Sequence, residues 1–415
     1  MTAALAVAAG LVAQIAPTEA PAGFTTTPLS PNITPQSVSN GIPEPPGDTY
    51  LADQGQFEMV HDTTNGLGPV FNGASCAQCH QNSVTGAASQ ITELRVGHTD
   101  SGGNFVNPTV LINDGATSIA NRSIVDDRSL CDQAQEHVPD SETITSRRAV
   151  LSILGDGFVE AIPDQALMSL ATQQAAVTKG VIHGEAIVIP ILESPGMTQV
   201  GRFGWKDQQP TVLSFAGDAY LNEMGVTNRL RPTDVTSVCK STTDPEDTPD
   251  SNGLANIDHF AQFIRGTMAP PRDTVLAATD DAKAGAILFD QVGCSVCHVS
   301  SFVTAPAGTV INGGAYTVPD AIGNKTFHPY GDFLLHDIGT GDGIVQVGPP
   351  DTAFKLRTVP LWGLHIRSRF MHDLESLTLS DAIKRHKGEA EQVTRRFRRL
   401  TPQEQQQLLT FLKSL

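Results

Sequence analysis

The sequence of 415 residues is poor in basic and in aromatic residues. It carries 27 Lys and Arg against 44 Asp and Glu, a formal net charge of −17. A surface this acidic repels phosphate backbones, so the composition argues against a protein that binds nucleic acid. Aromatic residues make up only 6% of the chain, whereas 37 Gly and 27 Pro predict much irregular loop between modest helices.

The sequence also lacks a long apolar run. The run from Ala3 to Ile15 is too short to span a membrane comfortably, so we expect no integral membrane span. Ala20-Pro21-Ala22 follows it and fits the small-residue cleavage site of a secretory signal, although no Lys or Arg precedes the run. We interpret residues 1–22 as a possible signal segment and expect an exported protein, periplasmic or extracellular.

Cysteine is scarce as well, and four of the six cysteines form two identical patterns, Cys76-Ala77-Gln78-Cys79-His80 and Cys294-Ser295-Val296-Cys297-His298. Two thiols three positions apart can add to the two vinyl groups of one haem, and the next imidazole then reaches the iron. A lone Cys-x-x-Cys could instead be a redox pair or half a zinc site. The histidine in both copies favours haem. The sequence predicts two covalently bound c-type haems, with His80 and His298 as iron ligands.

Cys131 and Cys239 remain outside these patterns. Covalent haem is normally assembled outside the cytoplasm, where spare thiols tend to pair. We therefore expect a disulfide between them; two buried free thiols are the alternative.

Two features divide the chain. Residues 23–48, rich in Thr, Pro, Ser and Asn, predict an extended arm. The paired prolines of Ala269-Pro270-Pro271-Arg272 exclude helix and indicate a linker. We predict a first haem domain over residues 49–275 and a second over residues 276–415.

The second predicted domain has a regular frame. A helix over residues 282–289 precedes Cys294, and Thr401-Pro402-Gln403-Glu404 is a capping box that opens an amphipathic C-terminal helix. Such a pair of helices is typical of a small cytochrome c domain. The expected fold class is mainly α with extensive loops, comprising two cytochrome c-like haem domains, the first enlarged by insertions.

The second axial ligand decides whether a haem carries electrons or binds a small molecule. His386 is the candidate ligand for the second haem. Thr378 caps a predicted helix on which Leu379, Ala382, Ile383 and His386 share one apolar face and which Gly388 ends. A histidine on an apolar face is often a plain core residue, but beside a haem we expect a ligand.

No histidine is clearly indicated for the first haem, which weakly favours an open site. His336 and His372 each precede Asp and are expected to hydrogen-bond a propionate or a distal ligand. Surface or core roles are expected for the remaining candidates, whose contexts show no pattern: His61, His98, His183 and His259.

Several motifs together resemble the di-haem oxidoreductase family of peroxidases, also described as thiol oxidoreductase-like and similar to bacterial di-haem cytochrome c peroxidases. These motifs are Gly66–Asn72 before Cys76, Gly157–Pro163, Gly201–Lys206, Leu334–Asp337, and His386 with Gly388-Glu389-Ala390. In the related peroxidases a distal ligand, usually Met, follows a His-Asp-Gly motif by fourteen residues. His386 follows His372 by that spacing, and His in place of Met should lower the haem potential. The Gly and Arg of the family pattern are replaced by Leu374 and Glu375.

The resemblance implies a division of labour. The second haem would receive and store electrons from a small redox carrier of the cytochrome c or cupredoxin type, and the first would react with a peroxide. Glu160 would be the acid–base group, and Trp205 would relay electrons between the haems. The plain alternatives are a salt-bridge partner for Glu160 and a core aromatic for Trp205.

Two other function classes stay open: a pure electron-transfer cytochrome with both haems six-coordinate, and an oxygenase that cleaves an organic substrate. A calcium ion between the domains is a further possibility that the sequence does not support. Arg395-Arg396-Phe397-Arg398-Arg399 predicts a solvated helix face or, alternatively, a docking site for an acidic electron donor.

Overall fold

The computed structural model describes residues 16–23, 39–112, 118–119 and 122–415. Residues 1–15 of the predicted signal segment and residues 24–38 of the predicted arm lie outside the described residues. The described end of the signal segment contains β1 (Thr18–Glu19), which pairs in parallel with β16 (Lys325–Phe327). Strand β1 is therefore part of a sheet formed with the predicted second domain.

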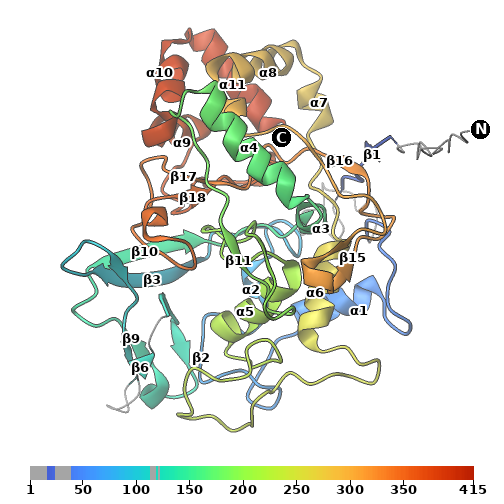
Figure 1. Cartoon of the computed structure of the whole chain (residues 1–415), viewed down its shortest axis with the longest axis vertical. Helices are drawn as coiled ribbons and strands as arrows, with labels where there is room; N and C mark the ends of the chain where they lie inside the picture. Colours follow the sequence, from blue (N-terminus) through green and yellow to red (C-terminus); the bar gives the residue numbers. More distant parts are fainter. Residues whose placement is uncertain (1–15, 24–38, 113–117, 120–121) are drawn as a thin grey trace, which may run out of the picture.

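Helices gather in two parts of the molecule, with α8, α10 and α11 at the top of Figure 1 and α1 and α6 at its lower right. The helices are α1 (Tyr50–Glu58), α2 (Cys76–Cys79), α3 (Asp156–Glu160), α4 (Asp164–Val177), α5 (Val212–Met224), α6 (Asn256–Gly266), α7 (Thr274–Ala277), α8 (Asp280–Val292), α9 (Leu379–Arg385), α10 (Glu391–Arg399) and α11 (Pro402–Lys413). None of the described helices is long and apolar enough to cross a membrane.

The same helix arrangement frames both Cys-x-x-Cys-His patterns. Helix α8 precedes Cys294 and packs against α11, and α1 precedes Cys76 and packs against α6. Glycine permits both close crossings. A Cβ on Gly285 would lie 2.0 Å from the Gln407 carbonyl oxygen, and one on Gly266 would lie 2.7 Å from the ring of Tyr50. The capping box of α11 forms as predicted, with the Thr401 side chain accepting from the Glu404 N–H.

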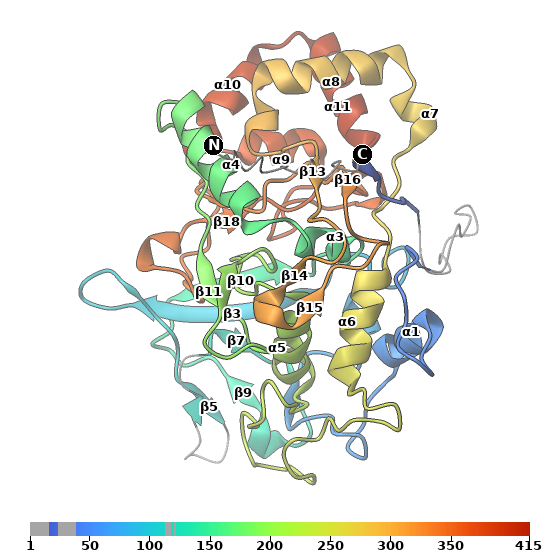
Figure 2. The same ribbon diagram turned by 45° about the vertical axis from the view of Figure 1, so that its right-hand side comes forward.

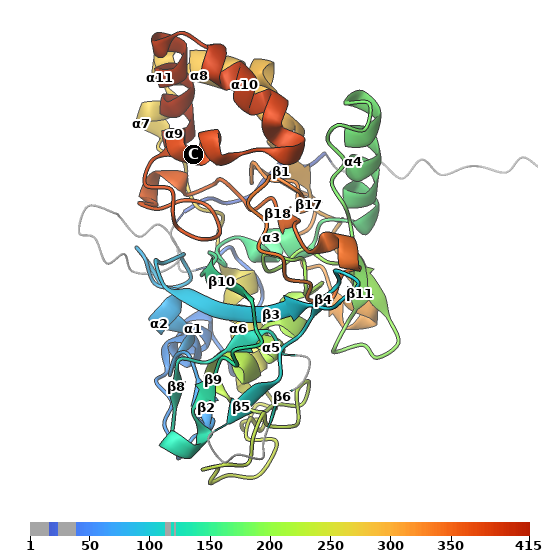
Figure 3. The same cartoon turned by 90° about the vertical axis from the view of Figure 1, so that its left-hand side faces the viewer.

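A β-structure between these helix pairs was missed by the sequence analysis. Antiparallel strands β3 (Thr92–Thr99) and β10 (Ile144–Ala149) cross the middle of the molecule (Figure 3). Helix accounts for 32% of the structure and strand for 15%, so "mainly α" overstates the helix content. Strand β10 pairs with β3 from about fifty residues earlier in the chain, and most of the other strands are two or three residues long, too short for a periodic pattern.

The short strands form small sheets around this pair. They are β2 (Val70–Phe71), β4 (Phe105–Val106), β5 (Val110–Ile112), β6 (Ser118–Ile119), β7 (Ile124–Val125), β8 (Arg128–Ser129), β9 (Glu136–His137), β11 (Val188–Pro190), β12 (Thr198–Val200), β13 (Phe302–Val303), β14 (Val310–Ile311), β15 (Tyr316–Thr317), β17 (Leu335–His336) and β18 (Leu356–Arg357).

The main hydrophobic core draws on both sides of the Pro270-Pro271 linker. Phe158 and Phe263 from one side pack in one cluster with Phe327 and Trp362 from the other. A second cluster, including Phe289, lies among α8, α10 and α11. The segment from β13 to Trp362 therefore packs into the core of the first half of the chain.

The disulfide between Cys131 and Cys239 is confirmed. The Cα atoms of the two residues are 6.4 Å apart, and the bridge closes a loop across 108 positions of the sequence. Cys131 packs beside the small core of Val70, Ile112 and Ala134. The bridge therefore ties the strand-rich insertion to the loop that follows α5.

Candidate functional site

The structure brings each Cys-x-x-Cys-His pattern to a cavity of its own. Cys294, Cys297 and His298 line the larger cavity, of about 220 Å³. The first pattern, Cys76 to His80, lines the smaller cavity, of about 170 Å³. Because the two cysteine pairs line different cavities, they do not form a four-thiolate zinc site.

The second pattern folds as a tight turn that aims His298 into the larger cavity. Helix α8 ends at Gly293, whose φ of 100° lies in the left-handed region. The turn closes with a hydrogen bond from the His298 N–H to the Cys294 carbonyl, 2.9 Å long. The His298 Nδ1 lies 3.1 Å from the Tyr330 carbonyl oxygen. A carbonyl can only accept, so Nδ1 carries the proton and Nε2 presents its lone pair.

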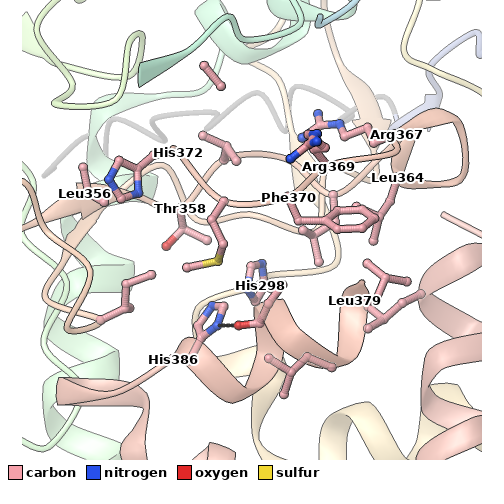
Figure 4. Close-up of a pocket in the computed structure, with 18 of the residues that line it drawn as sticks. His298, Leu356, Thr358, Leu364, Arg367, Arg369, Phe370, His372, Leu379 and His386 are labelled. Carbon is pink, nitrogen blue, oxygen red and sulfur yellow. Dashed lines mark hydrogen bonds between the residues drawn. The ribbon is translucent and has the colours of Figure 1, made fainter. Parts of the chain in front are cut away.

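His386 lies opposite His298 in the same cavity (Figure 4). The predicted apolar face is confirmed, because Leu379, Ala382, Ile383 and His386 all line this cavity. Helix α9 ends at Arg385, so His386 caps the helix and Gly388 lies beyond its end, a small correction to the predicted boundary. The His386 Nδ1 donates to the Ala382 carbonyl at 2.8 Å, which again leaves Nε2 as the free acceptor.

The separation of these two rings matches a shared metal ion. Imidazole nitrogens bind metals at about 2.0–2.1 Å, so two imidazoles on opposite faces of one iron have ring centroids about 6 Å apart. The centroids of His298 and His386 are 6.5 Å apart. Burial lowers the pKa of His298 to about 4 and also lowers the pKa of His386, so both rings are neutral, as a ligand must be.

A cation in the wall of the larger cavity also fits a haem. Arg367 and Arg369 lie together at one side (Figure 4). Burial lowers the pKa of Arg367 to about 10. Among the described residues no carboxylate forms an ion pair with Arg367, so its guanidinium suits an anionic group such as a haem propionate. The residues of this cavity therefore fit a haem with an imidazole on each face.

The smaller cavity differs in having one imidazole. His80 is the only histidine among the described residues of its lining. Burial lowers the pKa of His80 to about 4, and the edge of the Phe57 ring packs against it at 6.0 Å between centroids. The Sδ of Met224 lies 4.0 Å from the Cys76 Sγ.

Trp205 contributes to the walls of both cavities. Its indole Nε1 donates to the Ala149 carbonyl at 2.8 Å, and the Ala149 N–H donates to the His372 carbonyl at 2.7 Å. The His372 ring meets the indole edge-on, with centroids 6.0 Å apart. Trp205 and Ala149, joined by this hydrogen bond, therefore lie between the two cavities and line both of them.

The two histidines that precede Asp differ in their surroundings. His372 lines the larger cavity, as an interaction with a bound group requires. His336 instead lies between two carboxylates, with Nε2 2.9 Å from the Asp332 Oδ2 and Nδ1 2.8 Å from the Glu389 Oε2. Burial alone would lower the pKa of His336, but Asp332 raises it well above its ordinary value. Both of its nitrogens are thus used within the protein.

Glu160 does not lie in the lining of either cavity, so the geometry does not support the predicted acid–base role. Its side chain is fully buried, and its two oxygens accept from the Arg265 guanidinium at 2.6 and 2.9 Å. The Asn312 amide and the Val212 N–H also donate to it, each at 2.9 Å. Burial would raise the pKa of Glu160, but Arg265 outweighs it and lowers the pKa. Glu160 is therefore the buried salt-bridge partner of Arg265, the plain alternative given in the sequence analysis.

A different pair of carboxyl groups, Glu93 of β3 and Glu223 of α5, lines the smaller cavity. Arg95 holds Glu93 through two hydrogen bonds of 2.5 and 3.1 Å, and Asn72 donates to Glu223 at 2.9 Å. Burial, and next the charge of Glu93, raises the pKa of Glu223 well above its ordinary value. Burial would raise the pKa of Glu93 too, but Arg95 lowers it. Of the two carboxyl groups, Glu223 is therefore the one that keeps a proton to higher pH.

Sequence reasoning missed this pair because no local pattern marks it. Glu93 lies in a strand that was not predicted, and Glu223 lies near the end of a helix more than a hundred residues later. Only the packing of β3 and α5 around the smaller cavity brings the two carboxyl groups together.

Two helix-framed cavities, each with a Cys-x-x-Cys-His pattern and with one tryptophan between them, define a di-haem protein. The model of the family described as "Di-haem oxidoreductase, putative peroxidase" matches residues 127–415. The chain belongs to this family and is an oxidoreductase. The match includes the second Cys-x-x-Cys-His pattern and begins after the first.

Solved structures resemble the chain only distantly. Hydrazine synthase from Kuenenia stuttgartiensis is 15% identical, with a TM-score of 0.38, and the match covers 93% of this chain and 100% of that one. A MauG-like protein associated with microbial copper homeostasis is 16% identical, with a TM-score of 0.39 and coverages of 90% and 93%. A variant of the diheme peroxidase BthA from Burkholderia thailandensis is 16% identical, with a TM-score of 0.40 and coverages of 96% and 94%. No curated protein matches the sequence significantly.

Proposed function

We propose that the protein reduces peroxides, with haem supplying the redox chemistry at each cavity: electrons enter from a small redox carrier at the larger cavity and reach the peroxide at the smaller one. The observation that carries this proposal is the difference between the cavities. His298 faces a second imidazole, whereas His80 is the single histidine among the described residues of the smaller cavity. A closed iron site suits electron storage, and an iron site with one protein ligand suits the binding of a small molecule.

Covalent attachment belongs to the same proposal. Cys76, Cys79, Cys294 and Cys297 are unpaired, and each pair lies with its histidine in one cavity wall. Thioether bonds to these four sulfurs would anchor two c-type haems. Haem absorbance that stays with the polypeptide after denaturation and acid–acetone extraction tests this. Export to the periplasm or beyond is supported by the disulfide and is tested by fractionation of the native cell.

We infer that electrons pass between the cavities through an indole ring and the hydrogen bonds beside it. Trp205 lines both, and Ala149 connects it through hydrogen bonds to the backbone of His372. The indole is the one large aromatic side chain of the described residues that the two linings share. We therefore assign Trp205 the relay role.

Reduction of a peroxide to an alcohol and water consumes two electrons and two protons, so the smaller cavity needs a proton donor. Glu223 holds a proton in that cavity, and the Glu93 carboxylate beside it can receive one in turn. Arg95 keeps Glu93 ionised and in place. We assign the Glu93–Glu223 pair the proton-transfer role that the sequence analysis gave to Glu160.

The donor would dock beside the larger cavity. Helix α10 lines that cavity with Val393 and Thr394, and on its other side it exposes four arginines, namely Arg395, Arg396, Arg398 and Arg399. This basic patch on an acidic protein suits an acidic carrier of the cytochrome c or cupredoxin type. Replacing Arg395 and Arg399 with Glu should lower kcat/KM for such a carrier severalfold at low salt, and the difference should shrink as ionic strength rises.

The matched control for the docking test is Lys283→Glu, which reverses a charge on the exposed face of α8. This variant should behave like the wild type. Equal losses in both variants would mean that net charge alone, and not the patch on α10, governs the encounter.

The decisive experiment is the low-temperature EPR spectrum of the oxidised protein, followed by peroxide turnover with a reduced carrier. We expect one low-spin signal from the larger cavity and one high-spin signal from the smaller, in the oxidised or the half-reduced protein. Turnover should consume two equivalents of reduced carrier per peroxide. Two low-spin signals that persist after half-reduction, without turnover, would make the protein an electron carrier and overturn the proposal.

A further inference from the structure

A group of carboxylates away from both cavities lies where the loop before α1 meets α6. The two helices run side by side at the lower right of Figure 2. Glu44, Asp48 and Asp53 come from the loop and the start of α1, and His259 comes from α6. Ligand atoms of Asp48, Asp53 and His259 all lie within 4.8 Å of one another. The side chains of Asp53 and Asp48 are 0% and 2% exposed.

Four of the six carboxylate oxygens in this group have no hydrogen-bond donor among the described residues. The Asp53 Oδ1 accepts from the His259 Nδ1 at 2.7 Å, and the Asp48 Oδ1 accepts from the Thr49 N–H at 2.8 Å. The other oxygen of each carboxylate is buried without a hydrogen bond, and so are both oxygens of Glu44. The Asp48 Oδ2 lies 3.5 Å from the His259 Nδ1, which is shared with Asp53. Buried carboxylate oxygens are normally satisfied, because an unpaired buried charge is costly. Four such oxygens in one place suit the binding of a cation.

Among the described residues, no lysine or arginine neutralises these carboxylates. No Lys or Arg forms an ion pair with these three carboxylates among the described residues, and His259 is the one group nearby that can carry positive charge. His259 also contacts a fourth carboxylate, because its Nε2 lies 3.6 Å from the Asp250 Oδ2. The three carboxylates therefore lie together without a neutralising lysine or arginine among the described residues.

A second group of three carboxylates in the same protein is neutralised by a lysine side chain. Asp234, Asp244 and Glu246 surround the Lys240 ammonium, whose Nζ lies 3.0 Å from Asp234, 3.2 Å from Glu246 and in contact with Asp244. Lysine neutralises this group from within. The two groups have similar composition, so the second one is a matched control for the first.

We propose that Glu44, Asp48 and Asp53 bind a calcium ion. The unpartnered atoms are all carboxylate oxygens, which a hard cation such as Ca²⁺ prefers. The His259 Nδ1 already donates to Asp53, so His259 orients that carboxylate and is not itself a ligand. The site joins the end of the predicted arm, with Glu44 and Asp48, to the start of the predicted first haem domain, with Asp53, whereas the calcium ion considered in the sequence analysis lay between the domains.

The ion would hold together the helix pair that walls the smaller cavity. Asp53 lies one helical turn before Phe57, and His259 directly precedes Phe260. Phe57 and Phe260 line the smaller cavity and meet edge to face, with centroids 6.1 Å apart. Binding at the start of α1 therefore fixes α1 against α6 and steadies this wall.

Calcium titration of the full-length haem-loaded protein, dialysed first against EDTA, tests the proposal. We expect calorimetry and elemental analysis to give one tightly held Ca²⁺ per chain, and saturating Ca²⁺ to raise Tm by at least about 3 °C. Asp53→Asn and Glu44→Gln should each weaken binding at least about tenfold. Asp244→Asn should bind calcium like the wild type.

Three results would overturn the calcium site. These are no saturable binding by the wild type at millimolar Ca²⁺, unchanged affinity in both Asp53→Asn and Glu44→Gln, or tight binding of Zn²⁺ but not Ca²⁺ at this position, which would make His259 a ligand. Haem absorbance and circular dichroism establish that each variant folds. Glu44→Gln, in a half-exposed loop residue, remains informative if Asp53→Asn does not fold.

Discussion

The imidazole rings of His298 and His386 face each other across the larger cavity with centroids 6.5 Å apart, and each donates its Nδ1 proton to a backbone carbonyl. The two bonds hold both Nε2 atoms toward the space between the rings. A protein that arranges two neutral imidazoles in this way is prepared for an iron with both axial positions filled.

Replacing His386 with Met should raise the potential of the haem at the larger cavity. A thioether stabilises ferrous iron better than an imidazole does, and we expect a shift on the order of 100 mV or more. A spectroelectrochemical titration measures both haem potentials in one experiment. The potential of the other haem serves as the internal control, and an unchanged pair of potentials would mean that His386 is not a ligand.

Trp205→Phe should slow electron transfer between the cavities by about tenfold or more, because phenylalanine is harder to oxidise and cannot donate to the Ala149 carbonyl. The spectra and potentials of both haems should stay nearly the same. Stopped-flow reduction by a carrier, followed by peroxide, measures the step.

Trp362→Phe is the control for this relay, because Trp362 is the other tryptophan, is buried in the main core and lies outside both cavity linings. It should destabilise the protein without slowing the transfer. Equal slowing in both variants would contradict a specific relay at Trp205.

Glu160→Gln should lower the free energy of unfolding and leave peroxide turnover nearly unchanged. Removing the charge from a buried, bidentate pair leaves the Arg265 guanidinium unpaired, which typically costs about 3–5 kcal/mol. Denaturant unfolding monitored by circular dichroism measures this loss. Peroxide turnover per folded molecule should fall less than about threefold, and a large fall would restore the catalytic interpretation of Glu160.

Glu223→Gln should show the opposite behaviour, with no loss of stability and turnover lowered by about 10²-fold, the usual effect of a lost acid–base group. The wild type should also lose activity at alkaline pH. The pKa of Glu223 is raised in the folded protein, so its proton is lost only as pH passes the folded-state pKa.

The same pKa shift has a consequence for stability. The unfolded chain releases the Glu223 proton near the ordinary value of 4.5 while the folded chain keeps it, so this group makes folding less favourable as pH rises between the two values. Glu223→Gln should remove that slope from the pH dependence of Tm. A slope that persists in the variant would assign the proton to another group.

Cys131→Ser should lower the stability of the first half of the chain by about 2–5 kcal/mol, because the disulfide closes a loop across 108 positions. Haem content should not change, since the bridge lies away from both cavities. Thermal unfolding with and without a reductant measures the effect, and the reductant should no longer matter in the variant.

Much of the chemistry could be predicted from short stretches of sequence. The two Cys-x-x-Cys-His patterns carry their own geometry, since the next imidazole is held beside the cysteines by one turn of chain. The helical spacing of Leu379, Ala382, Ile383 and His386 likewise predicted which side chains line the larger cavity. Local patterns succeed because the interactions that produce them are local.

Glu160 and His259 show the limit of such reasoning. Whether a glutamate is an acid or a salt-bridge partner depends on what meets it, and Arg265 meets Glu160 from a helix about a hundred residues away. His259 has no marked sequence context, yet it meets Asp53 across more than two hundred residues. The protonated Glu93–Glu223 pair and the wall at Trp205 arise in the same manner.

The sequence by itself therefore determined that the chain has two Cys-x-x-Cys-His sites, a helix before the second, an imidazole on the apolar face of a later helix and a net negative charge. Tertiary structure alone decided which carboxylates line a cavity, which are neutralised by arginine or lysine and which are left facing one another. The reason is physical. A Cys-x-x-Cys-His turn is formed by residues that are adjacent in the sequence. The charge state and role of a buried carboxylate are instead set by residues that are adjacent only in space.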